Sequence, residues 1–220
     1  MNRLMNNPKI NMAALFSASF FAFALMGLMA SSSFAATYNA GEHYEIISPA
    51  QPTNSKDKIE VVELFWYGCP HCFRLEPFVE RWLKKKPANV KFVRMPGVFR
   101  AEWEIHARAY YTAEILGVVD KVHRPMFDAI HEMKQRMNTE SSILALFKKH
   151  GVPEKDFKRV FRSFAVETKM RRAKDMGTRY QARGVPALIV NGKYRTSGHA
   201  AGSNSKVFKV VNQLIKMESK

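Results

Sequence analysis

Residues 59–72 have the sequence IEVVELFWYGCPHC, and this stretch decides the fold. Its first part, Ile59 to Tyr67, is largely apolar on both faces of an extended chain, which predicts a central strand covered on both sides. A helical pattern follows over residues 70–86. Cys69 and Cys72 are the only cysteines among 220 residues, so the expected strand leads into a CxxC pair at the start of the expected helix.

The spacing of the two cysteines suits a dithiol that cycles with a disulfide. Two intervening residues let both sulfurs approach within bonding distance across the first helical turn. The sulfur of Cys69 then faces unpaired backbone N–H groups and the positive end of the helix dipole, which favour thiolate over thiol. We therefore expect Cys69 to be the attacking thiolate and Cys72, one turn further in, to be the resolving thiol.

The helix dipole alone is too weak to make a strongly acidic thiol. It contributes at most about 2 kcal/mol, whereas one pKa unit corresponds to about 1.4 kcal/mol. The residues between the cysteines are therefore expected to contribute. His71 can carry positive charge or donate a hydrogen bond to the sulfur, and Pro70 suits the start of a helix, where its missing N–H would be unpaired anyway. An acidic Cys69 makes the disulfide a stronger oxidant, by about 30 mV per 1.4 kcal/mol.

Two other uses of the cysteine pair fit less well. A structural zinc site needs four ligands, commonly two such pairs, and this chain has one pair. A permanent disulfide would close a loop of about two residues and constrain the unfolded chain very little. We expect no metal site, and we assign no role to the single histidines, which share no metal-like spacing: His43, His106, His123, His131 and His199.

The N-terminus predicts export. Arg3 and Lys9 precede a charge-free stretch from Met12 to Ala30, and Ser33-Phe34-Ala35 offers small residues at the two positions that a signal peptidase recognises. We expect a signal peptide over residues 1–35, cut after Ala35. The apolar stretch is about long enough to span a bilayer, so an uncleaved membrane anchor stays open as the alternative.

Composition limits the remaining classes of protein. The formal net charge is +16, which fits a solvated surface or attraction to anionic headgroups or acidic partners. Binding to nucleic acid does not suit an exported chain. Residues 36–220 are long enough for one domain with an insertion.

The elements expected after the CxxC helix are a strand at Val90–Arg94, helices over about 100–166, a longer helix over 166–180, a strand at Ala187–Val190, a hairpin turn at Asn191-Gly192, a strand at Lys193–Thr196 and a C-terminal amphipathic helix.

Together these features resemble the DsbA-type periplasmic thiol:disulfide oxidoreductases of the thioredoxin superfamily. The resemblance is carried by the stretch that ends in CPHC, by the helical residues that follow, by Gly184-Val185-Pro186 and by the predicted signal peptide. It implies an α/β thioredoxin fold with an inserted all-helical subdomain. The implied division is a first thioredoxin-like part over 36–98, a helical insertion over 99–165 and a second thioredoxin-like part over 166–220.

The resemblance also implies roles for residues outside the CxxC pair. In this family the residue before a cis-proline lies beside the dithiol, and Val185-Pro186 matches that place; an ordinary trans proline that opens a strand is the alternative. The backbone of Val185 would then pair with an extended substrate segment. Glu63 and Arg94 match an acidic residue and its basic partner, so Glu63 would manage protons beneath Cys72. Alternatively, Glu63 reaches water at a strand edge.

The expected function is the introduction of disulfide bonds into reduced, unfolded secreted proteins in the periplasm. The resemblance implies reoxidation by a membrane partner similar to DsbB. We expect no cofactor beyond the Cys69–Cys72 disulfide, and nothing in the sequence demands more than a monomer. Two alternatives stay open. One is a disulfide reductase or isomerase of the same fold, and the other is a metal-handling or peptide-binding module that uses the dithiol as ligand.

Overall fold

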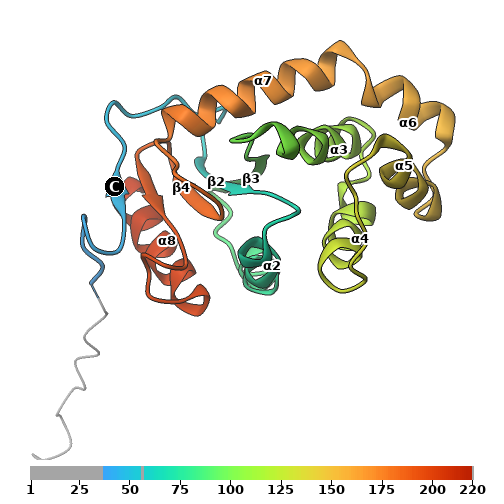
Figure 1. Cartoon of the computed structure of the whole chain (residues 1–220). Coiled ribbons are helices and arrows are strands. Elements are labelled where there is room, and N and C mark those ends of the chain that lie inside the picture. The colour runs from blue at the N-terminus through green and yellow to red at the C-terminus, as the bar shows by residue number, and fades with distance from the viewer. Residues whose placement is uncertain (1–36, 56, 220) are drawn as a thin grey trace, which may run out of the picture. The chain divides into compact units, whose positions relative to one another are not determined.

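The structure is a computed structural model that describes residues 37–55 and 57–219 (Figure 1). The predicted signal peptide over 1–35, its cut after Ala35 and the alternative of a membrane anchor lie outside the described residues. Among the residues that are described, no helix combines the length and the hydropathy needed to cross a membrane.

A mixed five-stranded sheet forms the centre of the described part, in the order β1-β5-β4-β2-β3. β2 pairs in parallel with β3 and antiparallel with β4, and β5 pairs antiparallel with both β4 and β1. All seven residues of β2 are buried, which confirms the expected central strand. The strands are β1 (Glu45–Ile46), β2 (Ile59–Phe65), β3 (Val90–Pro96), β4 (Ala187–Val190) and β5 (Tyr194–Thr196).

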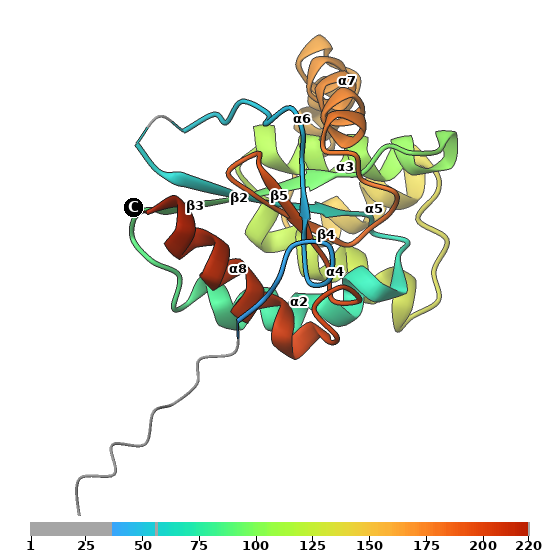
Figure 2. The ribbon, with the colours of Figure 1, turned by 90° about the vertical axis from the view of Figure 1, so that its left-hand side faces the viewer.

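Helices cover both faces of this sheet. Figure 2 shows α2 and α8 on one face and α3 and α7 on the other. The helices of the described residues are α2 (Pro70–Leu83), α3 (Glu104–Ile115), α4 (Val119–His131), α5 (Glu140–Lys149), α6 (Glu154–Phe161), α7 (Phe164–Arg179) and α8 (Asn204–Glu218), with a 3₁₀ turn at Ala101–Trp103. The helices α3 to α7 all lie between β3 and β4 in the chain. α3 to α6 fall within the helical insertion expected over 99–165, and α7 corresponds to the longer helix expected over 166–180.

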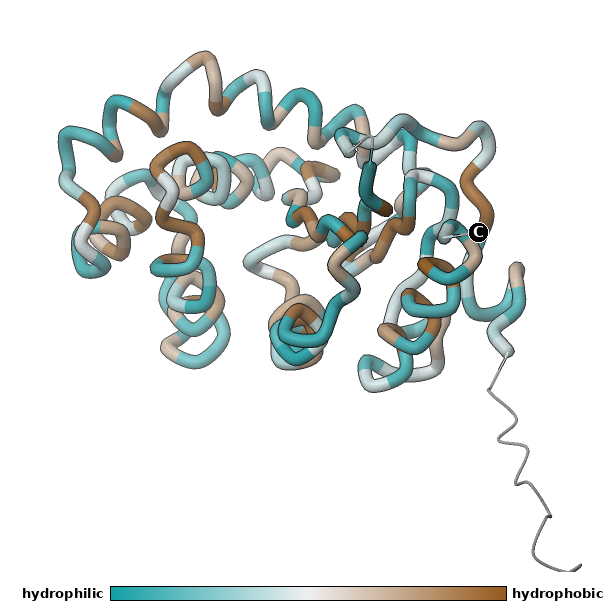
Figure 3. Tube along the Cα trace, turned by 180° about the vertical axis from the view of Figure 1, so that it is seen from behind, coloured by the Kyte–Doolittle hydropathy of each residue, from teal (hydrophilic) through white to brown (hydrophobic). Residues whose placement is uncertain are grey.

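The two layers bury two separate apolar clusters. Val61 packs with α2 and α8, whereas its neighbour Val62 packs with the helices between β3 and β4. This alternation follows from the two-residue period of a strand, and it explains why both faces of β2 had to be apolar. In Figure 3 the strands are mostly apolar, and the helices alternate between apolar and polar residues along their length.

Several element boundaries differ from the sequence-based expectation. β2 ends at Phe65 rather than Tyr67, because the chain turns out of the sheet to reach the CxxC pair. β3 continues to Pro96 rather than Arg94 and stays in register with the end of β2. α2 ends at Leu83 rather than residue 86, consistent with Pro87, which disfavours helical backbone in the residue before it.

The expected hairpin between β4 and β5 is present. Asn191 and Gly192 have φ angles of 51° and 66°, the left-handed pair that a tight hairpin turn requires. A Cβ atom on Gly192 would lie 2.0 Å from the backbone oxygen of Gln51, so this glycine also permits a close backbone approach. β5 begins at Tyr194, one residue later than expected.

Candidate active site

A short turn carries the chain from β2 to the dithiol. The N–H of Cys69 donates to the carbonyl of Trp66 at 3.0 Å and closes this turn. Cys69 is the N-cap residue of α2, and its Sγ accepts the N–H of Cys72 at 3.4 Å. Pro70 occupies the first turn of the helix, where a backbone N–H would have no hydrogen-bond partner within the helix, so the lack of one costs nothing. The dithiol therefore lies at a helix N-terminus.

The two sulfurs lie in different electrostatic environments. Both cysteines are free thiols; Cys69 is 7% exposed and Cys72 is 0% exposed. Hydrogen bonding to the Cys72 side chain lowers the pKa of Cys69 from 9.0 to about 6, aided by the N–H groups of Cys72 and His71 and by the charge of His71, and opposed by burial. Burial raises the pKa of Cys72 well above 9.0. Near neutral pH the pair is therefore one thiolate and one thiol.

His71 lies at the exposed edge of the dithiol. Its Nδ1 is 3.1 Å from Nη2 of Arg74. Because a guanidinium group can only donate, Nδ1 of His71 is the acceptor in this contact. A ring that accepts from Arg74 is neutral, so the charge of His71 that lowers the pKa of Cys69 belongs to the protonated ring, whereas the backbone N–H of His71 acts in both forms.

The loop that precedes β4 meets the dithiol from the other side. The Val185–Pro186 peptide bond is cis rather than trans. The sulfur of Cys69 lies 3.5 Å from the carbonyl oxygen of Val185. A Cβ atom on Gly97, just after β3, would lie 3.1 Å from the side chain of Val185, so the end of β3 also adjoins this loop. The sequence-predicted residues Cys69 and Val185 are thus brought together.

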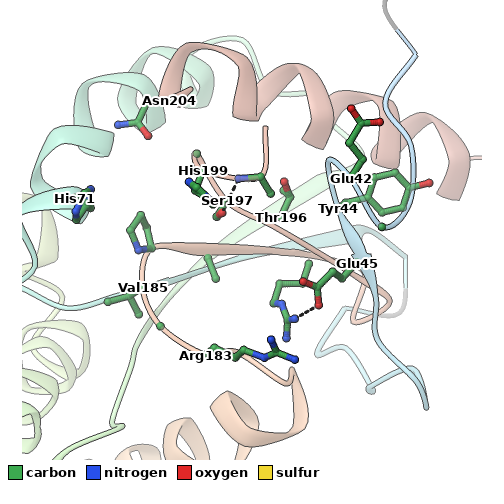
Figure 4. Close-up of a pocket in the computed structure, with 17 residues that line it drawn as sticks. Glu42, Tyr44, Glu45, His71, Arg183, Val185, Thr196, Ser197, His199 and Asn204 are labelled. Atoms are coloured by element: carbon green, nitrogen blue, oxygen red, sulfur yellow. Dashed lines mark hydrogen bonds and ion pairs between the residues drawn. The ribbon is translucent and has the colours of Figure 1, made fainter. Parts of the chain in front are cut away.

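A groove of about 520 Å³ lies along this loop and reaches His71 (Figure 4). It lies between the loop with the cis-proline, β5 and its connection to α8, and the segment that leads into β1. His71 lines the end of the groove next to the dithiol. Arg195 and Glu45 form an ion pair within it. The lining of the groove is partly polar and partly apolar.

A cluster of buried charged side chains lies on the α2 side of the sheet. Glu63 and Arg94 face each other in the register of β2 and β3. Nε of Arg94 lies 3.4 Å from Oε2 of Glu63, and Nη2 of Arg94 donates to Oε2 of Glu76 at 3.0 Å. Glu63 is 0% exposed, so the alternative in which it reaches water is wrong.

The two carboxyl groups of this cluster differ in pKa. Burial, together with the charge of Glu76, raises the pKa of Glu63 from 4.5 to about 8, against the opposing charge of Arg94. Burial also acts on Glu76, but its pKa is lowered because His123 and Arg94 favour the anion. The charge of Glu63 in turn contributes to the raised pKa of Cys72. Glu63 is therefore coupled electrostatically to the buried thiol.

Comparison with known proteins identifies the family. The family model described as a DSBA-like thioredoxin domain matches residues 60–208. The chain belongs to the DsbA-like thioredoxin family. Its relatives include the thiol:disulfide interchange protein DsbA of Pseudomonas aeruginosa, 38% identical over 89% of this chain and 92% of the relative. The protein of the same name from Pseudomonas syringae is also 38% identical, over 93% of this chain and 94% of the relative.

Solved structures agree with this assignment. The crystal structure of Pseudomonas aeruginosa DsbA matches with a TM-score of 0.80 and 40% identity, over 83% of this chain and 95% of that one. The expected α/β thioredoxin fold with helices inserted between its two halves is therefore confirmed. The division of the DsbA-like domain at residues 98 and 165 stays a prediction.

Sequence reasoning missed two members of the buried cluster in this DsbA-like domain. Glu76 lies on the inward face of α2, between Leu75 and Val79, and His123 lies on the inward face of α4. Each is a polar residue at an apolar position of an amphipathic helix, which is the signal that could have found them. His123 is one of the single histidines to which the sequence alone assigns no role.

The helices between β3 and β4 also support the turn that carries the dithiol. The ring of Trp66 stacks on Trp103 with centroids 4.3 Å apart and planes 5° from parallel. Nε2 of His131 lies 2.7 Å from the carbonyl oxygen of Tyr67, and its ring stacks on Phe73 of α2. Within residues 37–55 and 57–219, no group of three or more histidine, cysteine or acidic side chains could hold a metal ion.

Proposed function

We propose that this thiol:disulfide oxidoreductase introduces disulfide bonds into exported proteins through Cys69 and Cys72. The observation that carries the proposal is the difference between the two sulfurs. Cys69 is held as a thiolate at the N-terminus of α2, whereas Cys72 is buried and protonated. A reduced form that is stabilised in this way makes the disulfide a ready donor of oxidising equivalents.

The exchange proceeds in two balanced steps. A substrate thiolate attacks Sγ of Cys69 in the disulfide, so a mixed disulfide forms and the sulfur of Cys72 leaves and takes up a proton. A second thiolate of the same substrate then attacks the substrate sulfur of the mixed disulfide and releases Cys69 as a thiolate. The substrate loses two electrons and the Cys69–Cys72 pair gains them. No cofactor beyond this disulfide is required.

We assign substrate positioning to the loop with the cis-proline. The carbonyl of Val185 lies 3.5 Å from Sγ of Cys69, so a substrate strand that pairs with the backbone of Val185 would have its cysteine beside that sulfur. Pro186 lines the same groove. Backbone pairing depends little on side-chain identity, which suits an enzyme that acts on many unfolded chains.

We assign proton transfer to Glu63. Its pKa of about 8 lets it hold a proton near neutral pH and deliver that proton to Cys72 as the disulfide opens. Arg94 contacts both Glu63 and Glu76, and its charge prevents the two carboxyl groups from both becoming neutral. His71 and Pro70 complete the proposed site by favouring the Cys69 thiolate and the start of α2.

The same proposal specifies the substrates, the compartment and the partner that reoxidises the enzyme. The substrates are reduced, unfolded secreted proteins, and the enzyme acts as a monomer in the periplasm after removal of residues 1–35. A membrane protein similar to DsbB reoxidises the reduced dithiol. Nucleic acid has no part in this function.

Equilibration with glutathione redox buffer tests the proposal. An oxidase gives a dithiol that glutathione reduces readily, whereas a strongly reducing potential would favour the reductase or isomerase alternative. Oxidation of a reduced client peptide provides the second measurement, and Cys69→Ser is expected to abolish it. Tight copper binding together with failure to oxidise the peptide would instead support the metal-handling alternative.

A further inference from the structure

A histidine from α4 lies inside the buried charge cluster. His123 is 6% exposed; its Nδ1 lies 2.9 Å from the hydroxyl of Tyr67, and its Nε2 lies 3.3 Å from Oε1 of Glu76. Aromatic rings surround the imidazole at centroid distances of 5.2 to 6.1 Å, and they belong to Phe65, Tyr67, Tyr110 and Phe127. The ring is thus enclosed, with one nitrogen directed to the turn that carries the dithiol and the other to α2.

The hydroxyl of Tyr67 determines the tautomer of this histidine. Burial raises the pKa of Tyr67 well above 10.0, so the phenol keeps its proton and can donate it to Nδ1. The pKa of His123 is lowered, chiefly by burial, so the ring is neutral and carries a single proton. Because Nδ1 accepts from Tyr67, that proton lies on Nε2, the nitrogen that faces Glu76.

The two buried carboxyl groups have unequal access to donors. Oε2 of Glu76 accepts from Arg94, and its Oε1 lies 3.3 Å from Nε2 of His123, which is close enough for electrostatic attraction although the geometry gives no hydrogen bond between these two atoms. Within the described residues, neither oxygen of Glu63 accepts a hydrogen bond, and its contact with Nε of Arg94 is 3.4 Å long. One guanidinium cannot compensate two buried carboxylates, so one of the two carboxyl groups keeps a proton near neutral pH.

We propose that His123 is a positioning residue that places this shared proton on Glu63. Its Nε2–H stabilises Glu76 as the anion, and repulsion from that anion keeps Glu63 protonated. The proton is then available on the carboxyl group that is coupled to Cys72. This inference rests on the proposed role of Glu63 as the proton donor, and it gives α4 a specific part in the chemistry of the dithiol.

Other titratable groups around the cluster do not replace His123. α2 contributes Glu80, whose charge acts on His123, and Cys72, which is protonated. α3 contributes Tyr110, whose pKa is raised by burial, so it stays neutral. β3 contributes Arg94, which both carboxyl groups share. Two groups therefore distinguish Glu76 from Glu63: Arg94, which donates a hydrogen bond to Glu76 alone, and His123, which contacts Glu76 alone.

Carbon-13 NMR of the reduced enzyme tests the proposal directly. The carboxyl carbons of Glu63 and Glu76 are assigned by through-bond correlation to the backbone, and their shifts are followed against pH as one coupled pair. In the parent enzyme Glu63 is protonated and Glu76 ionised at pH 7, one unit below the pKa of about 8 for Glu63. In His123→Leu the apparent pKa of Glu63 falls by about one unit and that of Glu76 rises.

Two further variants separate the polar contact between His123 and Glu76 from simple packing of the ring. His123→Gln keeps an N–H at about the depth of Nε2 and is expected to restore the parent titration. His106→Leu is the matched control, because His106 is also a buried histidine of the helical insertion, and its Nε2 contacts the carbonyl of Met137 rather than a carboxylate. Its replacement should leave both carboxyl titrations unchanged.

The proposal is overturned if Glu63 in His123→Leu titrates as in the parent, or if His106→Leu shifts it equally. A second measurement separates this result from the role of Glu63 itself. If His123→Leu moves the proton but Glu63→Gln oxidises a client peptide at the parent rate across the pH range, the assignment of the proton stands and the proposed use of that proton is wrong.

Discussion

The sulfur of Cys69 lies 3.5 Å from the carbonyl oxygen of Val185, although 116 positions separate the two residues in the chain. This approach requires β4 to lie directly beside β2, as their antiparallel pairing shows. The nucleophile and the backbone proposed to hold the substrate are therefore set by the same pair of central strands. Neither lies on a long loop, so their separation is fixed by the sheet.

The reduction potential of the dithiol should depend on pH with a bend near 6. Above this value the reduced pair is one thiolate and one thiol, so reduction takes up one proton per two electrons and the potential falls by about 30 mV per pH unit. Below it reduction takes up two protons, and the slope becomes about 59 mV per pH unit. Equilibration with a dithiol buffer of known potential measures both slopes. A two-proton slope that continues unbroken to about pH 8 would show that Cys69 is an ordinary thiol.

His71→Leu should make Cys69 less acidic. The substitution removes the charge that helps to lower the pKa of Cys69, so the pKa should rise from about 6. Each unit of this rise makes the potential more negative by about 30 mV. Thiolate absorbance against pH gives the pKa, and glutathione equilibrium gives the potential. Arg81→Gln is the control, because Arg81 is an exposed cation in the last turn of the same helix and should leave both values unchanged.

The predictable parts of the fold are those that depend on local sequence. The buried strand and the CPHC stretch adjoin each other in the chain, so their arrangement follows from hydrophobic pattern and helix capping alone. The hairpin follows from the backbone preferences of Asn191 and Gly192. Glu63 stands out in the sequence because a carboxylate interrupts the apolar run from Val61 to Phe65.

The parts that escaped prediction depend on how helices dock. Glu76 and His123 are 47 positions apart, and their contact exists because α2 and α4 pack together beside Tyr67. Periodicity shows that each faces inward but cannot show which partner it meets. The stacking of Trp66 on Trp103 has the same origin, since it joins the dithiol turn to a segment that follows β3.

Glu63→Gln should stabilise the protein at neutral pH more than at acid pH. The pKa of Glu63 is raised by folding, so its protonated form is favourable below 4.5, and that contribution is lost as the pH rises toward about 8. A neutral glutamine avoids this loss. The free energy of unfolding of the variant should therefore exceed that of the parent by an amount that grows between these two values, to about 4 kcal/mol at the upper end. Urea unfolding across this pH range measures it, and a constant difference would contradict a buried, protonated Glu63.

The same substitution should slow the oxidation of a reduced client. Without the carboxyl proton of Glu63, Cys72 must take its proton from solvent when the disulfide opens. The loss is expected to reach about 100-fold near neutral pH and to shrink at acid pH, where solvent protons are abundant. Stopped-flow measurement of mixed-disulfide formation with a cysteine-containing peptide follows this step. A rate equal to that of the parent at every pH would remove Glu63 from the reaction.

Gly68→Ala should disturb the dithiol turn through one identifiable clash. A Cβ atom at Gly68 would lie 2.3 Å from the ring of Trp66, which cannot move freely because it stacks on Trp103. Overpacking of this kind costs about 1–3 kcal/mol of unfolding free energy. Gly184→Ala is the control, since a Cβ atom there meets nothing within 4 Å.

A double-mutant cycle shows whether that clash is the cause. In a Trp66→Ala background the obstructing ring is gone, so Gly68→Ala should cost less than half of what it costs in the parent, giving a coupling energy on the order of 1 kcal/mol or more. The free energies of unfolding of the four proteins supply the cycle. If Gly68→Ala lowers the free energy of unfolding equally in both backgrounds, then something other than the ring of Trp66 makes glycine necessary at position 68. Because the turn sets the position of Cys69 at the start of α2, the clash should also raise the thiol pKa in Gly68→Ala, and Trp66→Ala should bring it back toward about 6.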